Sequence, residues 1–560
     1  MAPLSVSIKH SGKTYPVELD TSAAPAEFKD AIYKVTGVPP DRMKVMIKGG
    51  YLKDDTDWKK VAPKAGQIFM VIGAAGELPK PPSEKVLFLE DMTDSQLADA
   101  LRLPVGLHNL GNTCYMNSTI QVLRAVPELH TALSTFDGRG NTNKDLIAAM
   151  RDLYRGMGQT TEGFPPYKFL QLLRVVAPQF AETRQGVYAQ QDADECWVQI
   201  VNSLTNAPLS GFSLANGGSS MPPPAPNTKF VDQFLSGEMT KTLICDEAPD
   251  EAPTIIKERI LKLDCNISIS TNYMHSGILD SLNQKVEKRS PSLGREAVYT
   301  ETSRISRLPA NLTVHMVRFY WRRDINKKAK IMRKVKFPLE LDVINLVTPA
   351  LKEKLLPLNT ALGQIEKERD ERRKTRRKSK AKATEDAAVA AVTSNNVTSA
   401  PAAVTIPEIQ MVDASHTTGT SSAVAPSEPI PGVLEDEAVV RARENETLRA
   451  LIDPELAADV GSSPHGIYEL CGIVTHKGAS ADGGHYIGWV KKDAIDSSLA
   501  SGSGLSSSKP REDYDDPKDE WYKFDDDKVS IVNKEKILNL DGGGEDSTAY
   551  ILLYRSKPIN

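Results

Sequence analysis

Short alternating runs of apolar and polar residues open the chain. Residues 4–8 and 15–19 place apolar side chains at every second position with a Ser-Gly turn signal between them, so we expect a β-hairpin. Apolar residues at helical spacing over 28–35 predict a helix, and two further alternating runs end at Ile47 and Ile72. A hairpin, a helix and two more strands form a β-grasp, so the first region is an α+β domain.

The later part of the chain changes from helical to strand-like periodicity. Apolar residues recur at helical spacing after Cys114 and again after Gln190. Strand-like segments then follow, at 312–316, 467–475, 485–490, 521–524 and 549–554. This order predicts a second α+β domain in which helices precede a sheet.

A stretch rich in Pro and Gly separates these two regions. We therefore place one domain at 1–76, a linker at 77–100 and a second domain at 101–560. A chain of 560 residues is too long for a single hydrophobic core, which agrees with this division.

Low-complexity stretches interrupt the second domain near 206–228, 363–460 and 495–520. They are rich in small, polar or charged residues and poor in aromatic ones. Because such segments bury little apolar area, we expect them to be disordered insertions. The middle stretch contains a basic run, Arg372–Lys382, which is either a solvated segment or a nuclear-import signal.

Charge and composition exclude several classes of protein. The net charge of -4 gives no basic excess for a nucleic-acid partner. No apolar run is long enough to span a membrane, and the first residues lack the apolar region of a signal peptide. The cysteines are odd in number, widely spaced and without a CxxC pair, which favours a reducing compartment. They are Cys114, Cys196, Cys245, Cys265 and Cys471.

Cys114 is the strongest candidate for chemistry. A polar, Gly-containing loop arrives at this residue, and apolar residues at helical spacing follow it directly. Cys114 is therefore expected at a helix N-terminus, where the helix dipole favours a thiolate. The alternative is a small buried apolar residue without a chemical role.

A thiolate nucleophile needs a base, and two histidines compete for that role. His485 follows two glycines, which let backbone approach closely, and it begins an apolar strand. His476 ends the preceding strand of the same predicted hairpin and could face the same cleft. The glycines favour His485 on residue chemistry alone. A run of carboxylates at 525–527, which follows a predicted strand, supplies a group to orient the imidazole.

Residues 106–118 closely resemble the cysteine box of the ubiquitin-specific proteases, a family of deubiquitinating cysteine proteases. Residues 468–490 resemble the histidine box of the same family. The resemblance implies a papain-like α+β catalytic domain, described as fingers, palm and thumb. It also implies that Cys114 is the nucleophile and His485 the base in hydrolysis of isopeptide bonds at the C-terminal glycine of ubiquitin.

The resemblance assigns two supporting residues as well. The family motif places the orienting residue at the first Asp after Phe524, which is Asp525, and Asp526 is the alternative. Asn109 matches the family position of an oxyanion donor, with the Cys114 backbone N–H as the second donor. A non-catalytic ubiquitin-binding adaptor is the alternative function, although an adaptor has no need to keep all these groups.

Residues 190–195 resemble a further family box, which lines the substrate channel. On residue chemistry alone, this acidic stretch is also a favourable first turn of a helix. The resemblance implies contacts with the basic C-terminal tail of ubiquitin, whose arginines suit a carboxylate such as Asp192. We expect these contacts at Gln190, Asp192, Gly484 and Tyr486.

Members of this family often bind zinc through two CxxC pairs. Here the corresponding region contains only Cys245 and Cys265, each without a near neighbour. We therefore expect no metal site, and no cofactor.

The N-terminal domain is similar to ubiquitin itself in three short stretches, at 12–14, 37–41 and 51–54. It lacks the Gly-Gly end that conjugation needs, so it is an integral ubiquitin-like domain. By strand parity, we expect Met46, Phe69 and Val71 to face away from the core. These residues are either scattered surface apolar groups or a docking face.

The combination of the two domains resembles proteasome-associated members of the family. It implies docking on the regulatory particle of the 26S proteasome and removal of ubiquitin from bound substrates. It also implies low activity when the chain is free, with loops near 320–334 and 478–484 obstructing the cleft. The expected partners are ubiquitin, ubiquitinated proteins and the proteasome, and we expect a monomer when free, in the cytoplasm and the nucleus.

Overall fold

The computed structural model describes residues 3–48, 50–73, 93–101, 103–136, 142–206, 229–322, 327–394, 436–479, 483–496, 519–543 and 547–559. The chain divides into two compact units, Met1–Met92 and Thr93–Asn560. Within the described residues, no helix is long and apolar enough to cross a membrane.

The N-terminal unit is a β-grasp, as predicted. Its strands are β1 (Leu4–His10), β2 (Lys13–Leu19), β3 (Lys44–Ile47), β4 (Gly50–Tyr51) and β5 (Ile68–Ile72), paired in the order β2-β1-β5-β3-β4. Helix α1 (Pro25–Thr36) covers one face of this sheet, and the short helix α2 is Trp58–Val61. Helix α1 ends at Gly37, whose φ of 71° is the left-handed conformation that favours glycine.

The predicted outer face of this unit is wrong at two of its three positions. Phe69 and Val71 are only 1% and 3% exposed, and they belong to the core beneath α1, where the ring of Phe69 meets Phe28 at a centroid distance of 5.6 Å. The strand register explains the difference, because β5 pairs Val71 with the buried Val45. The exposed side, here called the N-terminal apolar face, consists of Met46, Tyr51, Ile68, Met70 and Ile72.

The second unit begins with a helical subdomain. Its helices are α3 (Asp94–Leu101), α4 (Cys114–Leu123), α5 (Pro127–Ser134), α6 (Thr142–Met157), α7 (Tyr167–Val176), α8 (Ala193–Asn206) and α9 (Phe230–Phe234). Every residue of α4 is buried, so this helix lies in the centre of the subdomain. A short hairpin, β6 (Thr183–Arg184) and β7 (Val187–Tyr188), precedes α8.

A mixed sheet forms the centre of this unit. Its strands run in the order β10 (Leu263–Asn266), β13 (Asn311–Val317), β21 (Thr548–Ser556), β17 (Ile467–Lys477), β18 (His485–Lys491), β19 (Glu520–Asp525) and β20 (Lys528–Asn533), and β16 (Glu340–Asp342) pairs with β17. Tyr486 and Val490 of β18 face the core around α4, whereas Ile487 and Trp489 face a second core that includes α10 (Met274–Leu282) and α15 (Lys534–Leu538). Both faces of the sheet are therefore covered.

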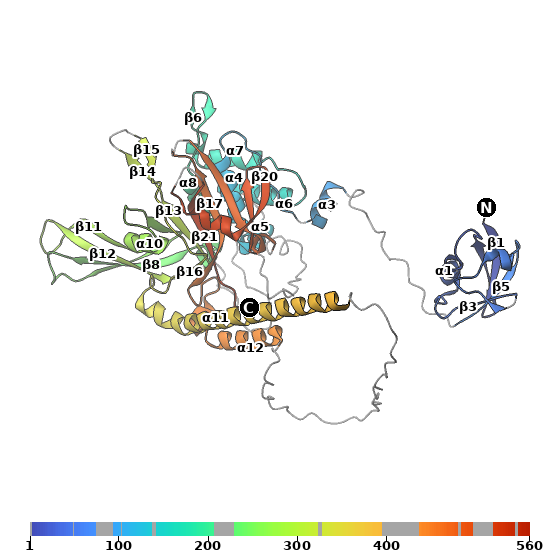
Figure 1. Cartoon of the computed structure of the whole chain (residues 1–560). Coiled ribbons are helices and arrows are strands. Elements are labelled where there is room, and N and C mark those ends of the chain that lie inside the picture. The colour runs from blue at the N-terminus through green and yellow to red at the C-terminus, as the bar shows by residue number, and fades with distance from the viewer. Residues whose placement is uncertain are drawn as a thin grey trace, which may run out of the picture. The chain divides into compact units, whose positions relative to one another are not determined.

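A separate sheet extends from one side of the central sheet (Figure 1). It consists of β11 (Asn283–Arg289), β12 (Glu296–Arg307), β8 (Gly237–Cys245) and β9 (Thr254–Ile260), in that order. At its end, the carboxylate of Glu251 accepts hydrogen bonds of 2.5 Å from both Ser290 and Tyr299. The order of helices, central sheet and extended sheet agrees with the expected α+β arrangement of thumb, palm and fingers.

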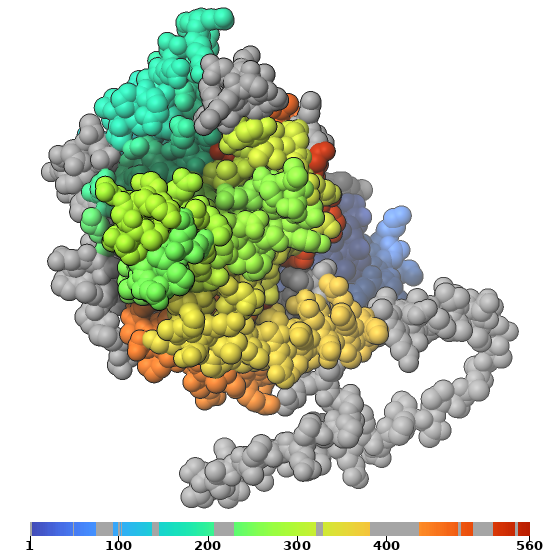
Figure 2. Space-filling model, turned by 90° about the vertical axis from the view of Figure 1, so that its left-hand side faces the viewer, coloured from blue at the N-terminus to red at the C-terminus, as the bar shows by residue number. Residues whose placement is uncertain are grey.

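The prediction that 363–460 is disordered is wrong at both ends of that range. Helix α11 (Pro349–Ser394) continues deep into it, and α12 (Glu437–Ala450) and α13 (Pro454–Ala458) occupy its end. The views of Figures 1 and 2 show α11 (yellow) beside α12 (orange). Lys, Arg, Glu and Ala are strong helix formers, and the two helices share an apolar contact between Leu358, Leu362 and Leu448. The remainder of that insertion, 395–435, lies outside the described residues, as do 207–228 and 497–518 of the other two.

Candidate active site

Cys114 is the first residue of α4, as the sequence predicts. The preceding loop is fixed by its own side chains, since Thr113 Oγ1 accepts a hydrogen bond of 2.9 Å from the backbone N–H of Leu110. The dipole of α4 places its positive end at the thiol, which favours a thiolate. Cys114 therefore has the location of a nucleophile, although its side chain is buried.

His485 lies at the start of β18 and contacts two of the other predicted groups. Its Nε2 donates to Asp525 Oδ1 at 2.6 Å, which leaves Nδ1 for the Cys114 thiol. The hydrogen bond with Cys114 raises the pKa of His485 to about 9; the bond to Asp525 adds to the effect, and burial opposes it. An imidazole with this pKa is a cation at neutral pH and stabilises a thiolate beside it.

Asp525 ends β19 and lies behind the imidazole. Besides the His485 proton, its carboxylate accepts a hydrogen bond of 2.8 Å from Lys523 Nζ. Burial pushes the pKa of Asp525 upward, but the hydrogen bonds from Lys523 and His485 outweigh it and hold the pKa below its ordinary value. Asp525 is therefore an anion that can support the imidazolium.

Asp526 accepts its hydrogen bonds from the loop before Cys114 and from α4, although its charge also contributes to the raised pKa of His485. Its backbone has the left-handed φ of 54°, and its two carboxylate oxygens accept hydrogen bonds of 2.8 Å from the side-chain amides of Asn109 and Asn117. Asn109 Oδ1 in turn accepts from the backbone N–H groups of Gly111 and Thr113. The Asn109 side chain is thus held at both ends. No role was predicted for Asn117, whose only signal in the sequence is its position within the cysteine box.

Gln190 connects the two sides of the site. Its Nε2 lies 3.6 Å from Cys114 Sγ and donates to the carbonyl oxygen of Gly484 at 2.9 Å. Asp192 lies further along the same segment, where its Oδ1 accepts from the Tyr550 hydroxyl at 2.7 Å and from the backbone N–H of Asp194 at 2.8 Å. Asp192 therefore caps the N-terminus of helix α8 and also joins it to β21.

Tyr486 is buried in a cluster of aromatic rings behind this segment. Its ring centroid lies 4.8 Å from that of His476 and 6.1 Å from that of Tyr550. Burial raises the pKa of Tyr486 well above its ordinary value, so the phenol stays neutral.

His476, the alternative base, is buried among these rings instead of facing Cys114. Burial, together with the charges of Lys330 and His485, lowers the pKa of His476 to about 3, so its imidazole is neutral. Neither ring nitrogen has a hydrogen-bond partner among the described residues. His476 packs directly behind Gly484, where a side chain on the glycine would come within 2.6 Å of His476 Nε2.

Lys330 ties together the two loops expected to flank the cleft. It belongs to β15 (Lys327–Lys330), which pairs with β14 (Phe319–Arg322). Its Nζ donates to the carbonyl oxygens of His476 at 2.8 Å and of Gly478 at 3.0 Å. Burial, with the charge of Arg318, lowers the pKa of Lys330 to about 8. Parts of both predicted loops, 323–326 and 480–482, lie outside the described residues.

Comparison with known proteins agrees with this geometry. A family model described as ubiquitin carboxyl-terminal hydrolase matches residues 105–554, and a ubiquitin family model matches residues 6–74. Ubiquitin carboxyl-terminal hydrolase 6 of Schizosaccharomyces pombe is 38% identical over 559 residues, covering 99% of both chains. Ubiquitin carboxyl-terminal hydrolase 7 of Arabidopsis thaliana is 34% identical and covers 100% of both. Ubiquitin carboxyl-terminal hydrolase 14 of Caenorhabditis elegans is 29% identical over 99% of this chain and 94% of its own.

The family match spans nearly all of the second unit, and the ubiquitin match spans the β-grasp. With Cys114, His485 and Asp525 in contact at the start of α4, the chain has the thiol chemistry that this family uses. The chain belongs to the ubiquitin carboxyl-terminal hydrolases of the ubiquitin-specific type: it is a thiol-dependent deubiquitinating enzyme with an N-terminal ubiquitin-like domain.

Proposed function

We propose that this enzyme removes ubiquitin from proteins held by the 26S proteasome, to whose regulatory particle it docks through its ubiquitin-like domain. The contact of His485 with both Cys114 and Asp525 carries the catalytic part of the proposal. The exposed apolar face of the N-terminal unit supports the docking part.

In the proposed reaction, the Cys114 thiolate attacks the carbonyl carbon of the C-terminal glycine of ubiquitin. His485 then gives its proton to the amine of the leaving lysine, which breaks the isopeptide bond and leaves a thioester. Water, deprotonated by His485, hydrolyses the thioester and restores the thiolate. Asp525 holds the imidazole in position and stabilises its charged form throughout.

The developing oxyanion needs hydrogen-bond donors. A side-chain amide has two N–H donors, and Asn109 uses one of them for Asp526. We propose that the second N–H of Asn109, together with the backbone N–H of Cys114, binds the oxyanion. The contacts of Asn109 with Gly111, Thr113 and Asp526 fix its amide before substrate binds, so little reorganisation is required.

The tail of ubiquitin approaches Cys114 between two segments that the structure brings together. Gln190 lies on one side and Gly484 on the other, joined by a hydrogen bond of 2.9 Å. We propose that both contact the tail directly, that Tyr486 supports the channel wall, and that Asp192 attracts the arginines of the tail. A substrate tail must replace or pass beside the Gln190–Gly484 bond.

A direct test uses a ubiquitinated protein bound to purified proteasomes that lack their own thiol deubiquitinase. The enzyme should release free ubiquitin, and Cys114→Ala should release none while still binding the proteasome. Equal release by both proteins would show that the proteasome's other enzymes do the work and that this chain acts as an adaptor.

The docking surface is tested separately, with Met70→Asp in the centre of the N-terminal apolar face. An unpaired carboxylate in an apolar contact should weaken proteasome binding at least tenfold, or about 1.4 kcal/mol. Ala26→Asp, an equally charged change at an exposed position of α1, should bind normally. Equal binding by both variants would place the docking surface elsewhere.

We also propose that the free enzyme has low activity and that proteasome binding moves the loops joined by Lys330. Cytoplasmic and nuclear localisation is part of the proposal. Arg372 and Arg376 of the basic run form ion pairs with Glu437, so an import receptor would have to displace Glu437. Fusion of residues 366–394 to a reporter tests whether the basic run is a nuclear-import signal. A reporter that stays in the cytoplasm would show that it is not.

A further inference from the structure

Helix α11 contains a tandem repeat that plays no part in the active site. Residues 372–375 read Arg-Arg-Lys-Thr, and residues 376–379 read Arg-Arg-Lys-Ser. Each copy places a hydroxyl residue directly after three cationic ones. Arginines at the second and third positions before a hydroxyl residue form the charge pattern by which arginine-directed protein kinases recognise their substrates.

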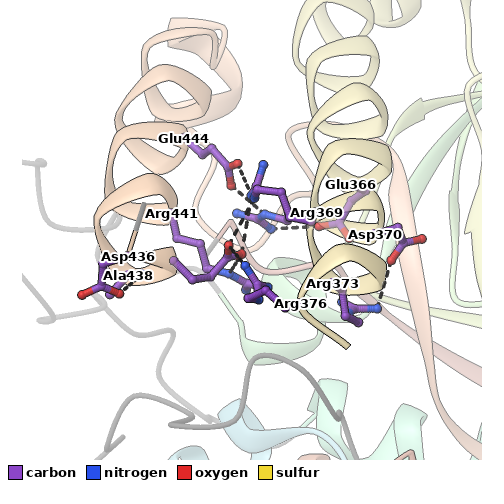
Figure 3. Close-up of polar contacts among 11 residues, drawn as sticks. Glu366, Arg369, Asp370, Arg373, Arg376, Asp436, Ala438, Arg441 and Glu444 are labelled. Carbon is purple, nitrogen blue, oxygen red and sulfur yellow. Dashed lines mark hydrogen bonds and ion pairs between the residues drawn. The ribbon is translucent and has the colours of Figure 1, made fainter. Parts of the chain in front are cut away.

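The first arginine of each copy holds α12 against α11. Figure 3 shows Arg369 and Arg376 of α11 opposite Arg441 and Glu444 of α12. Arg372 donates to both Glu437 and Glu444, at 3.1 and 2.6 Å, and Arg376 donates to Glu437 at 2.6 Å. Arg369, one turn earlier, donates to Glu444 at 2.7 Å. We call Arg369, Arg372, Arg376, Glu437 and Glu444 the α11–α12 clasp.

The clasp side chains are largely buried, so their ion pairs contribute to the packing of α12 on α11. The side chain of Glu437 is only 5% exposed. Burial pushes the pKa of Glu437 upward, but hydrogen bonds from Arg372, Arg376 and Arg441 outweigh it and lower the pKa to about 2. Glu437 is therefore a buried anion at neutral pH, and a buried anion that loses its cations is strongly destabilised.

The two hydroxyl groups lie next to the clasp but are themselves exposed. Thr375 lies three positions after Arg372, and Ser379 lies three positions after Arg376. Each hydroxyl residue is therefore next to its clasp arginine on the helix surface. Thr375 Oγ1 donates to the backbone oxygen of Glu371 at 2.9 Å, and Ser379 Oγ donates to that of Thr375 at 3.1 Å. A group added to either oxygen would lie within reach of the clasp arginines.

We propose that Thr375 and Ser379 are phosphorylation sites of an arginine-directed protein kinase, and that their phosphates release α12 by drawing Arg372 and Arg376 away from Glu437. This inference does not depend on the proposed proteasome function. It adds a covalent modification on a surface remote in sequence from Cys114.

The chemistry is an ordinary phosphoryl transfer from ATP. The hydroxyl oxygen forms a bond to the γ-phosphorus, the bond between that phosphorus and the bridging oxygen breaks, and ADP leaves. The hydroxyl proton passes to the carboxylate base of the kinase. The kinase needs its substrate in an extended conformation. Local opening of this stretch of helix is favoured by like charges four positions apart, in the pairs Arg373/Arg377 and Lys374/Lys378.

The outcome follows from a competition for arginine. A phosphate carries nearly two negative charges and three acceptor oxygens, so it is a stronger partner for a neighbouring guanidinium than a single carboxylate is. With both phosphates in place, Glu437 keeps its ion pair with Arg441, which belongs to its own helix. Glu437 then loses its ion pairs with Arg372 and Arg376, and the first turns of α12 separate from α11, while Arg369 still pairs with Glu444.

The test treats the full chain with ATP and the catalytic subunit of cyclic-AMP-dependent protein kinase. Tandem mass spectrometry should locate phosphate on Thr375 and Ser379, and a kinase directed to acidic sites should not label them. Amide hydrogen exchange over 437–450 should then accelerate about tenfold or more, while exchange over α4 stays unchanged.

Two variants separate modification from release. Glu437→Gln keeps the kinase motif and breaks the clasp, so it should show fast exchange over α12 without phosphate and little further change with it. Thr375→Ala combined with Ser379→Ala should show slow exchange before and after kinase treatment. Absence of phosphate from both hydroxyls would overturn the proposal, and so would phosphate on both with unchanged exchange over α12.

Discussion

Asn109 and Asp526 are joined by a hydrogen bond of 2.8 Å between the side-chain amide and a carboxylate oxygen. The neighbouring carboxylate, Asp525, instead contacts His485 at 2.6 Å. Two adjacent acidic residues at the end of one strand therefore face different parts of the site. One supports the base, and the other positions the proposed oxyanion donor, which separates their effects in kinetic experiments.

Asp526→Ala tests the positioning role. It removes the shared acceptor of Asn109 and Asn117, so the Asn109 amide loses its fixed orientation. We expect kcat for a ubiquitin C-terminal reporter to fall about a hundredfold, with a small change in KM, as when an oxyanion donor is lost. Asp527→Ala, an exposed neighbour, serves as the control and should retain nearly full activity. Equal losses in the two variants would point to a general disturbance of this turn.

Asp525→Asn tests the support of the imidazolium through the pH profile. The Asp525 carboxylate contributes to the raised pKa of His485, about 9, so its neutral replacement should lower that pKa. The reactive pair needs charged His485, and activity is lost on the alkaline side as this group loses its proton. The alkaline limb of kcat/KM should therefore move to lower pH, measured with steady-state rates across the alkaline range. An unmoved limb would remove Asp525 from this role.

Gly484→Ala tests the close packing behind His485. Gly484 has a left-handed φ of 136°, and an added Cβ would lie 2.4 Å from the carbonyl oxygen of Lys477 and 2.6 Å from His476 Nε2. The backbone must shift, and it carries His485 with it, so we expect at least about a hundredfold loss of kcat/KM. Gly483→Ala is the matched control, because no atom of the described part of the chain lies within 4 Å of its Cβ position. It should remain within about twofold of the parent enzyme.

Lys330→Met tests whether the two tied loops restrain the free enzyme. The variant keeps the apolar stem but leaves the carbonyl oxygens of His476 and Gly478 without this donor. We expect faster reporter hydrolysis by the free enzyme and a smaller stimulation by proteasomes. Lys336→Met, at an exposed position, should leave both rates unchanged. A slower free enzyme with normal stimulation would contradict the restraint.

The sequence predicted most of the active site because each of its catalytic side chains lies within a recognisable local motif. Cys114, His485 and Asp525 each begin or end a recognisable element, and the structure brings them together. The choice between His485 and His476 depended on the two glycines before His485. It agrees with the burial of His476 among aromatic rings, where a charged imidazole is unfavourable.

The errors arose where long-range pairing decides the outcome. The alternation in β5 was recognised, but its pairing with the buried Ile8 of β1 and Val45 of β3 shows that Phe69 and Val71 face inward. Helices α11 and α12 were missed because their ion pairs, such as Arg372 with Glu437, join residues 65 positions apart. Neither helix has a strongly apolar stripe, so periodicity alone could not reveal that they pack together.

The central claim is that Cys114 is the nucleophile that attacks the C-terminal glycine of ubiquitin. It is tested most directly by a ubiquitin bearing an electrophile at its C-terminus, with the modified cysteine located by peptide mass spectrometry. We predict a covalent adduct on Cys114, formed faster in the presence of proteasomes and absent from Cys114→Ala. An adduct on another cysteine, or none even with proteasomes present, would contradict the account.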